Sequence, residues 1–196
     1  MDEHKIVNGN KNLIVAFGGL VPKLGGIPPF EFLRYLSSTY DDVDLIFYFD
    51  QHQSWYHHGI GGISTDIKGT VSHLNNIIKK YDKVIFIGVS AGGYAAILFG
   101  SLCNVDHVMS FIPQTLLDCP RHRAFTEYTD LKEVINPTTQ YLVYGDTGET
   151  GPHHNFRHCD HINCFPNVTV IKDVNVAVRK LRDSGVLKQM IDARLR

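Results

Sequence analysis

Short apolar runs alternate along this chain with stretches in which apolar residues recur at the spacing of a helix. Six runs are rich in β-branched and aromatic residues and have the length of buried strands: residues 13–17, 45–49, 83–88, 107–112, 140–144 and 168–171. One predicted helix opens at Pro28-Pro29, and another begins after a cap at Ser64, Thr65 or Asp66. The alternation predicts a three-layer α/β fold with about six mostly parallel strands and flanking helices.

Composition narrows this picture to one domain, residues 1–196, because 43% hydrophobic residues suffice for one full-sized core. Nineteen basic and twenty acidic side chains form no basic block, which argues against nucleic acid or a membrane surface as a partner. The polar N-terminus carries no secretory or membrane segment, so we expect a soluble, cytoplasmic protein. The four cysteines, too few and too irregular for a disulfide framework, are expected to be reduced: Cys103, Cys119, Cys159 and Cys164.

The strongest chemical signal is the sequence Gly88-Val89-Ser90-Ala91-Gly92, which follows an apolar strand and precedes a helical stretch. This is the context of a nucleophile elbow, where glycines two positions either side of the serine let strand and helix approach. Ser90 is therefore the predicted nucleophile, the alternative being a structural turn between a strand and a helix. Backbone N–H groups of Ala91 and of Gly19, in the turn after the first strand, would form the oxyanion hole, unless Gly18-Gly19 is only a loop.

Taken together, several motifs resemble short α/β-hydrolase-like proteins of polysaccharide or glycoprotein biosynthesis, related to acetyltransferase-like accessory secretion proteins. They span nearly the whole chain: Phe17-Gly18-Gly19, Pro29-Phe30-Glu31-Phe32, Trp55-Tyr56-His57, the elbow with Gly93-Tyr94-Ala95-Ala96, Pro113-Gln114-Thr115, and residues 181–187. The resemblance implies a serine nucleophile and an ester or acyl-group substrate.

The chain departs from this pattern where the resemblance places the catalytic histidine, in the loop after the last strand. Asn175 stands there, and asparagine cannot accept the serine's proton. For the acid, Asp146 follows a strand's carboxyl end, where α/β folds place functional groups, and it is favoured over Glu149.

A histidine- and cysteine-rich segment, residues 152–164, offers a replacement base. In a helix, His154, His158 and His161 would share one face. His158, or secondarily His154, is the predicted base, held by Asp146. Two alternatives are a zinc site that adds Cys159 or Cys164, and a polar face without chemistry. The preferred interpretation involves no metal and no cofactor.

Four further residues are predicted to bind substrate, because they follow the second and fourth strands at the edge that carries Ser90: Trp55, Tyr56, His57 and Gln114. The alternative is that the two aromatic rings only cover the core.

The chain is thus predicted to be a serine esterase acting through an acyl-enzyme at Ser90 on a small-molecule ester or acylated sugar. Alternatives are an O-acyltransferase acting on a sugar or glycoconjugate, and a catalytically impaired ligand-binding relative; the oligomeric state is left open.

Overall fold

The fold is built around one mixed sheet in the computed structural model, which describes residues 2–21, 23, 29–118, 122, 124–148, 156–173 and 178–196. The strand order is β1-β3-β2-β4-β5-β6-β7. The strands are β1 (Glu3–Ile6), β2 (Asn12–Phe17), β3 (Asp44–Tyr48), β4 (Lys83–Val89), β5 (His107–Phe111), β6 (Gln140–Asp146) and β7 (Val168–Asp173). Only β1 pairs antiparallel, against β3, so the six predicted strands form the parallel part of the sheet.

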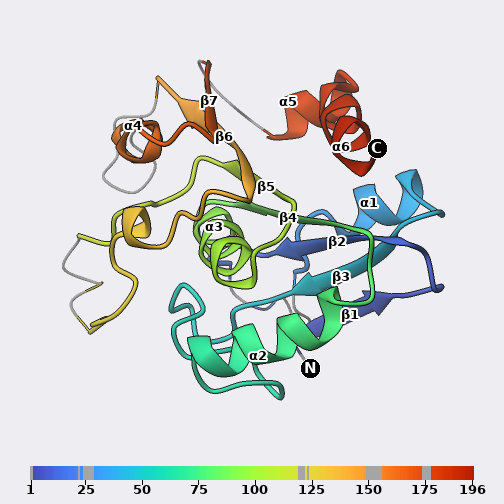
Figure 1. Cartoon of the computed structure of the whole chain (residues 1–196), viewed down its shortest axis with the longest axis horizontal. Helices are drawn as coiled ribbons and strands as arrows, with labels where there is room; N and C mark the ends of the chain where they lie inside the picture. Colours follow the sequence, from blue (N-terminus) through green and yellow to red (C-terminus); the bar gives the residue numbers. More distant parts are fainter. Residues whose placement is uncertain are drawn as a thin grey trace.

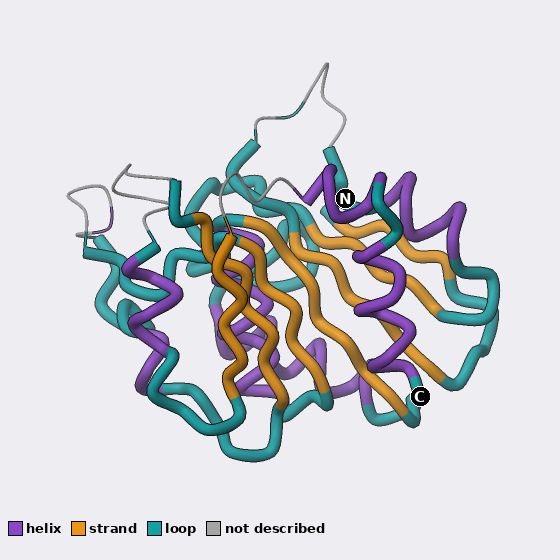
Figure 2. Tube along the Cα trace, turned by 90° about the horizontal axis from the view of Figure 1, so that it is seen from above, coloured by secondary structure: helices purple, strands orange, loops and turns teal. Residues whose placement is uncertain are grey.

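Helices cover both faces of this sheet (Figures 1 and 2). They are α1 (Leu33–Thr39), α2 (Ile67–Ile78), α3 (Ala91–Cys103), α4 (Arg157–Ile162), α5 (Val178–Asp183) and α6 (Val186–Leu195). Buried side chains of α2, α3 and α4 join one apolar cluster with the sheet, and those of α1 and α6 join a second cluster. The predicted three-layer α/β fold is confirmed.

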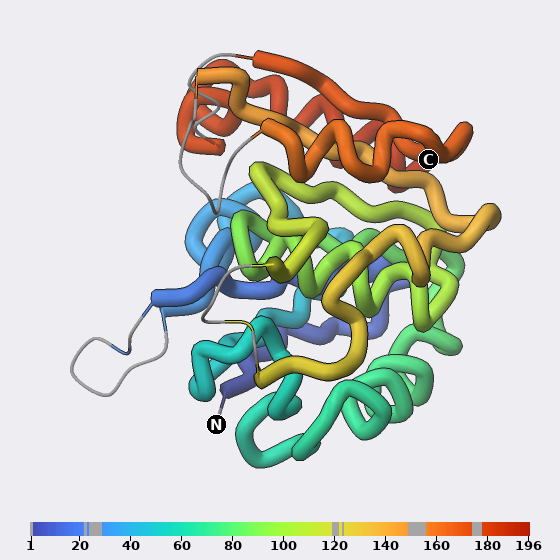
Figure 3. The backbone as a smooth tube through the Cα atoms, turned by 90° about the vertical axis from the view of Figure 1, so that its left-hand side faces the viewer, coloured from blue at the N-terminus to red at the C-terminus, as the bar shows by residue number. Residues whose placement is uncertain are grey.

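The two edges of the sheet come from opposite ends of the chain. β1 lies at one edge, and β7, which carries α4 beside it, lies at the other (Figure 3). Strand β4 therefore stands in the middle of the sheet, between β2 and β5. Because parallel strands share the same direction, the loops that follow β2, β4, β5 and β6 meet at one edge, where α/β folds place their sites.

One local prediction needs correction. Helix α1 begins at Leu33 rather than at Pro28-Pro29, because Phe32 before it has a left-handed backbone with φ 64°. Pro28 itself lies outside the described residues. In its described part, the polar segment 119–136 contains a 3₁₀ turn at Leu131–Glu133, and its Asp130 forms an isolated bridge with Leu116. None of the helices in the described part of the chain is long and apolar enough to cross a bilayer.

Candidate active site

Ser90 occupies the turn between β4 and α3, in the strand–turn–helix context that the sequence predicts. Its backbone has φ 56° and ψ −119°, a combination that residues other than glycine rarely adopt. Two backbone hydrogen bonds hold it there: its N–H donates to Phe111 O at 2.9 Å, and its C=O accepts from Tyr94 N at 2.9 Å. Ser90 therefore lies beyond the end of the strand, and it is partly exposed.

The glycines of the motif are required by close backbone contacts. A Cβ on Gly88 would lie 2.1 Å from Gly92 O, and a Cβ on Gly92 would lie 2.1 Å from Phe17 O. Both contacts are with backbone atoms, which cannot rotate away as a side chain can. Glycine at these positions therefore allows β2, β4 and α3 to pack closely enough for the turn to exist.

The predicted oxyanion residues lie on either side of Ser90. Ala91 is the first residue of α3, where helical N–H groups lack partners within the helix. Gly19 faces Ser90 from the loop after β2: a Cβ built on Gly19 would lie 3.9 Å from Ser90 Cβ. That loop is fixed at Gly18, whose N–H donates to Tyr48 O at 2.9 Å and whose C=O accepts from the Tyr56 hydroxyl at 2.9 Å.

A residue to which the sequence analysis assigned no role also reaches this loop. Glu31 Oε1 would lie 3.4 Å from a Cβ on Gly19, and burial raises the pKa of the Glu31 carboxyl to about 7, although the neighbouring Gly19 backbone lowers it. The sequence signal for Glu31 was only its place in Pro29-Phe30-Glu31-Phe32, a motif of the resemblance that says nothing about chemistry.

The structure describes only part of the histidine-rich segment 152–164, and the histidines that it describes have different partners. His154, like Glu149 and Asn175, lies outside the described residues, and α4 begins at Arg157. His158 is 2% exposed, and its carbonyl accepts from the Thr115 hydroxyl at 2.6 Å, in the segment that follows β5. His161 turns to another partner, since its Nε2 lies 2.7 Å from Asp130 Oδ1.

Asp118, to which the sequence analysis gave no role, is close enough to His158 for the two charges to interact. Burial alone would raise the pKa of Asp118, but a 2.9 Å hydrogen bond from Arg157 and the nearby His158 bring it below its usual value. The favoured acid, Asp146, ends β6, paired with Asp173 of β7, and its Oδ1 accepts the Gly148 N–H at 2.8 Å.

The alternative of a zinc site finds no ligand set in the described part of the chain, where no three His, Cys, Asp or Glu side chains form a group able to hold a metal. Cys159 is buried with its Sγ 3.6 Å from Tyr144 O, and burial raises the pKa of its thiol to about 12. Cys164 is exposed.

The aromatic residues predicted as pocket walls lie in the core instead. Trp55 is 2% exposed and Tyr56 is fully buried, both with positive φ. The indole Nε1 of Trp55 donates to Oε1 of Gln114, itself buried, at 2.5 Å. The buried Asp50 carboxylate holds this loop by accepting the N–H groups of His52, Ser54 and Tyr56. The apolar rings thus complete the core and support the Gly18 loop.

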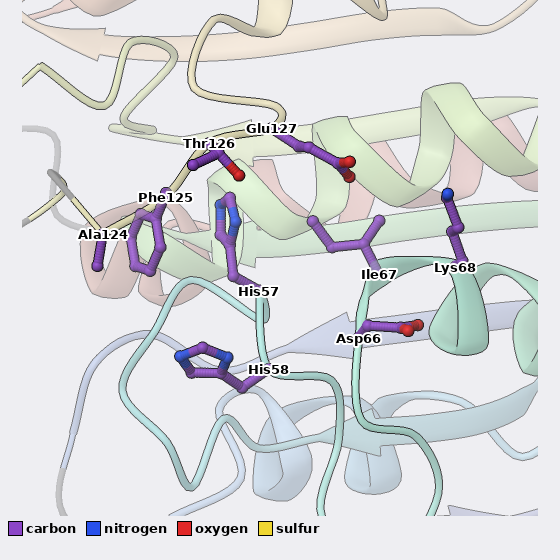
Figure 4. Close-up of a pocket in the computed structure, with 9 residues that line it drawn as sticks. All are labelled: His57, His58, Asp66, Ile67, Lys68, Ala124, Phe125, Thr126 and Glu127. Carbon is purple, nitrogen blue, oxygen red and sulfur yellow. The ribbon is translucent and has the colours of Figure 1, made fainter.

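His57 does line a cavity, of about 290 Å³, together with residues of α2 and of the segment 124–127 (Figure 4). Its ring stacks on Phe125 at 4.0 Å. The Tyr94 hydroxyl donates to Tyr128 O at 2.7 Å, so His57 Nε2, 3.0 Å from that hydroxyl, is the donor of their hydrogen bond. Burial, with smaller contributions from His58 and His122, lowers the pKa of His57 to about 4 and keeps it neutral.

Comparison with known proteins gives a match in structure only. No family model and no curated protein sequence matches the chain. The capsule O-acetyltransferase of Neisseria meningitidis serogroup A superposes with a TM-score of 0.68 at 13% identity, covering 97% of this chain and 90% of that one. FphF, a fluorophosphonate-binding serine hydrolase of Staphylococcus aureus, gives 0.66 at 12% identity, covering 97% and 86%.

A third solved structure, Thermogutta terrifontis esterase 2 phosphorylated by paraoxon, gives a TM-score of 0.64 at 13% identity and covers 95% of this chain and 84% of the esterase. At such low identity these likenesses concern the path of the backbone alone. The chain adopts the α/β-hydrolase fold.

Proposed function

We propose that this protein is a serine hydrolase that cleaves carboxylic esters through an acyl-enzyme on Ser90. The observation that carries the proposal is the strained backbone of Ser90, φ 56° and ψ −119°, between glycines whose Cβ atoms would collide with neighbouring backbone. Strain of this kind costs free energy and is retained where it serves chemistry. Here it presents the hydroxyl at the carboxyl edge of the sheet, beside the first amides of a 13-residue helix.

The proposed reaction begins when Ser90 Oγ attacks the ester carbonyl and a histidine accepts the serine's proton. The carbonyl oxygen becomes an oxyanion bound by the N–H groups of Gly19 and Ala91. The ester C–O bond then breaks, the leaving alkoxide takes the histidine's proton, and the acyl group remains on Ser90. Water, deprotonated by the same histidine, then attacks the acyl carbonyl. The bond between the acyl group and Ser90 Oγ breaks, the histidine returns the proton to Oγ, and the acid is released.

For the base we propose His158, with His154 as the second candidate. The Thr115 hydroxyl bonds the His158 backbone in the segment after β5, the strand next to β4, which supports a position at the edge that carries Ser90. Asp146 at the end of β6 is the proposed acid, with Glu149 as its alternative.

Acyl transfer to a sugar hydroxyl is the second candidate function. The observation favouring it is the superposition on a capsule O-acetyltransferase over 97% of this chain. Transfer would use the same residues, with an acceptor hydroxyl in place of water in the second step. The two candidates share the acyl-enzyme and differ only in what removes the acyl group.

The test is covalent labelling with a fluorophosphonate probe, followed by release of p-nitrophenol from short acyl esters. We expect Ser90→Ala to abolish both while leaving the melting temperature nearly unchanged, because the side chain is small and its role is chemical. Ser37→Ala, at an exposed serine of α1, is the control.

Labelling that persisted in Ser90→Ala would exclude Ser90 as the nucleophile, and a wild type that is neither labelled nor active would refute the proposal. Adding a sugar acceptor separates the candidates. Acylated sugar formed at the expense of free acid would identify transfer.

A further inference from the structure

The Glu31 carboxyl reaches the backbone that the proposed reaction needs. Glu31 lies in the turn before α1, next to Phe32 with its left-handed backbone. A Cβ built on Gly19 would lie 3.4 Å from Glu31 Oε1 and 3.9 Å from Ser90 Cβ, so the carboxyl and the serine border the same glycine. The Gly19 backbone is also close enough to this carboxyl to lower its pKa, against the larger effect of burial.

The second oxygen of the Glu31 carboxyl is buried. Among the described residues, Glu31 Oε2 has no hydrogen-bond partner. An ionised carboxylate with a single amide donor would be costly in such surroundings, whereas a neutral acid needs fewer partners. Burial accordingly raises the pKa of Glu31 to about 7.

The groups that face Glu31 do not neutralise it. It shares a cavity of about 200 Å³ with Tyr35 of α1 and with Arg179 and Arg182 of α5. Both arginines form ion pairs with the carboxylate of Asp183 on their own helix: Arg182 Nη2 lies 2.7 Å from it, and Arg179 Nε lies 3.8 Å from it. Their positive charges are therefore balanced by Asp183. From the other side, the buried Tyr56 is close enough for the Glu31 charge to raise its pKa, after the larger effects of burial and Asp50.

We propose that the Glu31 carboxyl occupies the Gly19 half of the oxyanion hole in the resting protein, and that a substrate oxyanion binds there only after the carboxyl has released the amide. This inference rests on the proposed function and makes Glu31 a positioning residue, since it acts through Gly19. A carboxylate holds an N–H more strongly than a neutral carboxyl does, and it also repels an oxyanion. Activity should therefore be permitted below pH 7, where Glu31 is neutral, and should be suppressed as the carboxyl ionises above pH 7.

Glu31→Gln tests this, because glutamine has the same shape and is neutral at every pH. The rate of fluorophosphonate labelling is measured at pH 6 and pH 8, since the phosphonyl oxygen enters the same hole. The ratio of the variant's rate to the wild-type rate should rise about tenfold from pH 6 to pH 8, because the neutral fraction of an acid with a pKa near 7 falls about tenfold. Titration of the base cancels in this ratio. The exposed Glu133→Gln is the matched control, and its ratio should stay flat.

The contact itself is read from the Gly19 amide resonance in ¹H–¹⁵N spectra of the whole chain. We expect its shift to titrate near pH 7 in the wild type and to lose this transition in Glu31→Gln. A Gly19 resonance that does not titrate in the wild type would overturn the inference, whether or not the variant folds.

The labelling outcomes separate the two proposals. Labelling with the same ratio at both pH values would overturn the inference and leave the serine-hydrolase function standing. No labelling of either protein at either pH would overturn the proposed function, and this inference with it.

Discussion

The two halves of the proposed active site are specified in different ways. The nucleophile half, at the turn from β4 to α3, is held by backbone contacts that admit only glycine at two positions. The acid and base half draws on side chains between the end of β6 and the start of β7, where His158 and His161 have partners far away in sequence. Five consecutive residues were enough to recognise the first half, whereas no short motif describes the second.

The histidine-rich segment 152–164 shows why side chains with distant partners are hard to place from sequence. Helical spacing gave His154, His158 and His161 one common face, but in the structure His158 and His161 have separate partners. His158 is buried beside Thr115 and Asp118, while His161 lies against Asp130. Periodicity states where a side chain points from its own helix, and the neighbouring elements decide what it meets.

The loss of the proposed base should reduce turnover more than any other change considered below. His158→Ala should lower kcat for a p-nitrophenyl ester by about two to four orders of magnitude, because general base catalysis contributes about this much. The corresponding barrier is roughly 3 to 5 kcal/mol.

His161→Ala is the matched control on the same helix and should keep near wild-type turnover, because His161 is paired with Asp130. Chemical denaturation checks that each variant is folded. If His158→Ala folds and turns over like the wild type, the base is another residue.

A smaller effect is expected from the nucleophile half. Gly92→Ala should lower the free energy of unfolding by about 3 kcal/mol, because its Cβ would lie 2.1 Å from the Phe17 carbonyl oxygen and neither backbone can yield. Urea denaturation measures the loss.

Gly69→Ala in α2 provides the comparison, since its nearest contacts are at 3.2 Å and alanine favours a helix. It should stay within about 1 kcal/mol of the wild type. Equal stability of Gly92→Ala and the wild type would mean that strand and helix do not approach as closely as this structure has them.

The smallest effect concerns the support of the oxyanion loop. Tyr56→Phe removes the hydroxyl that donates to Gly18 O at 2.9 Å and should cost about 1 to 2 kcal/mol of stability, because a buried carbonyl loses a donor. Ester turnover should fall severalfold as the loop at Gly19 loosens.

Tyr35→Phe is the matched control, because among the described residues the Tyr35 hydroxyl has no hydrogen-bond partner. Its loss should not reduce stability. Similar stability losses in both variants would show that the Gly18 contact is not what Tyr56 contributes.

The sequence predicted those parts of the fold best that depend on a single physical effect. Apolar runs predicted all six parallel strands, because strands covered by helices on both faces must be apolar throughout. Strand β1 was missed because Glu3–Ile6 is a four-residue polar segment that needs β3 as its partner. Glu31 was missed as a functional group because its burial next to Gly19 arises only in the folded chain. The Trp55 and Tyr56 rings were misplaced because both alternatives have the same sequence pattern.

The contact of Gly92 with Phe17 also bears on the order of folding. The turn at Ser90 lies within a few residues of sequence, but the backbone atoms that confine it belong to β2, which is separated from it by β3 and α2. Contacts between such distant segments form slowly, because the intervening chain must lose its conformational freedom before the contact is made. The strained backbone geometry of Ser90 should therefore arise late in folding, after the centre of the sheet has assembled, so partly folded chains would contain the motif without the strained turn.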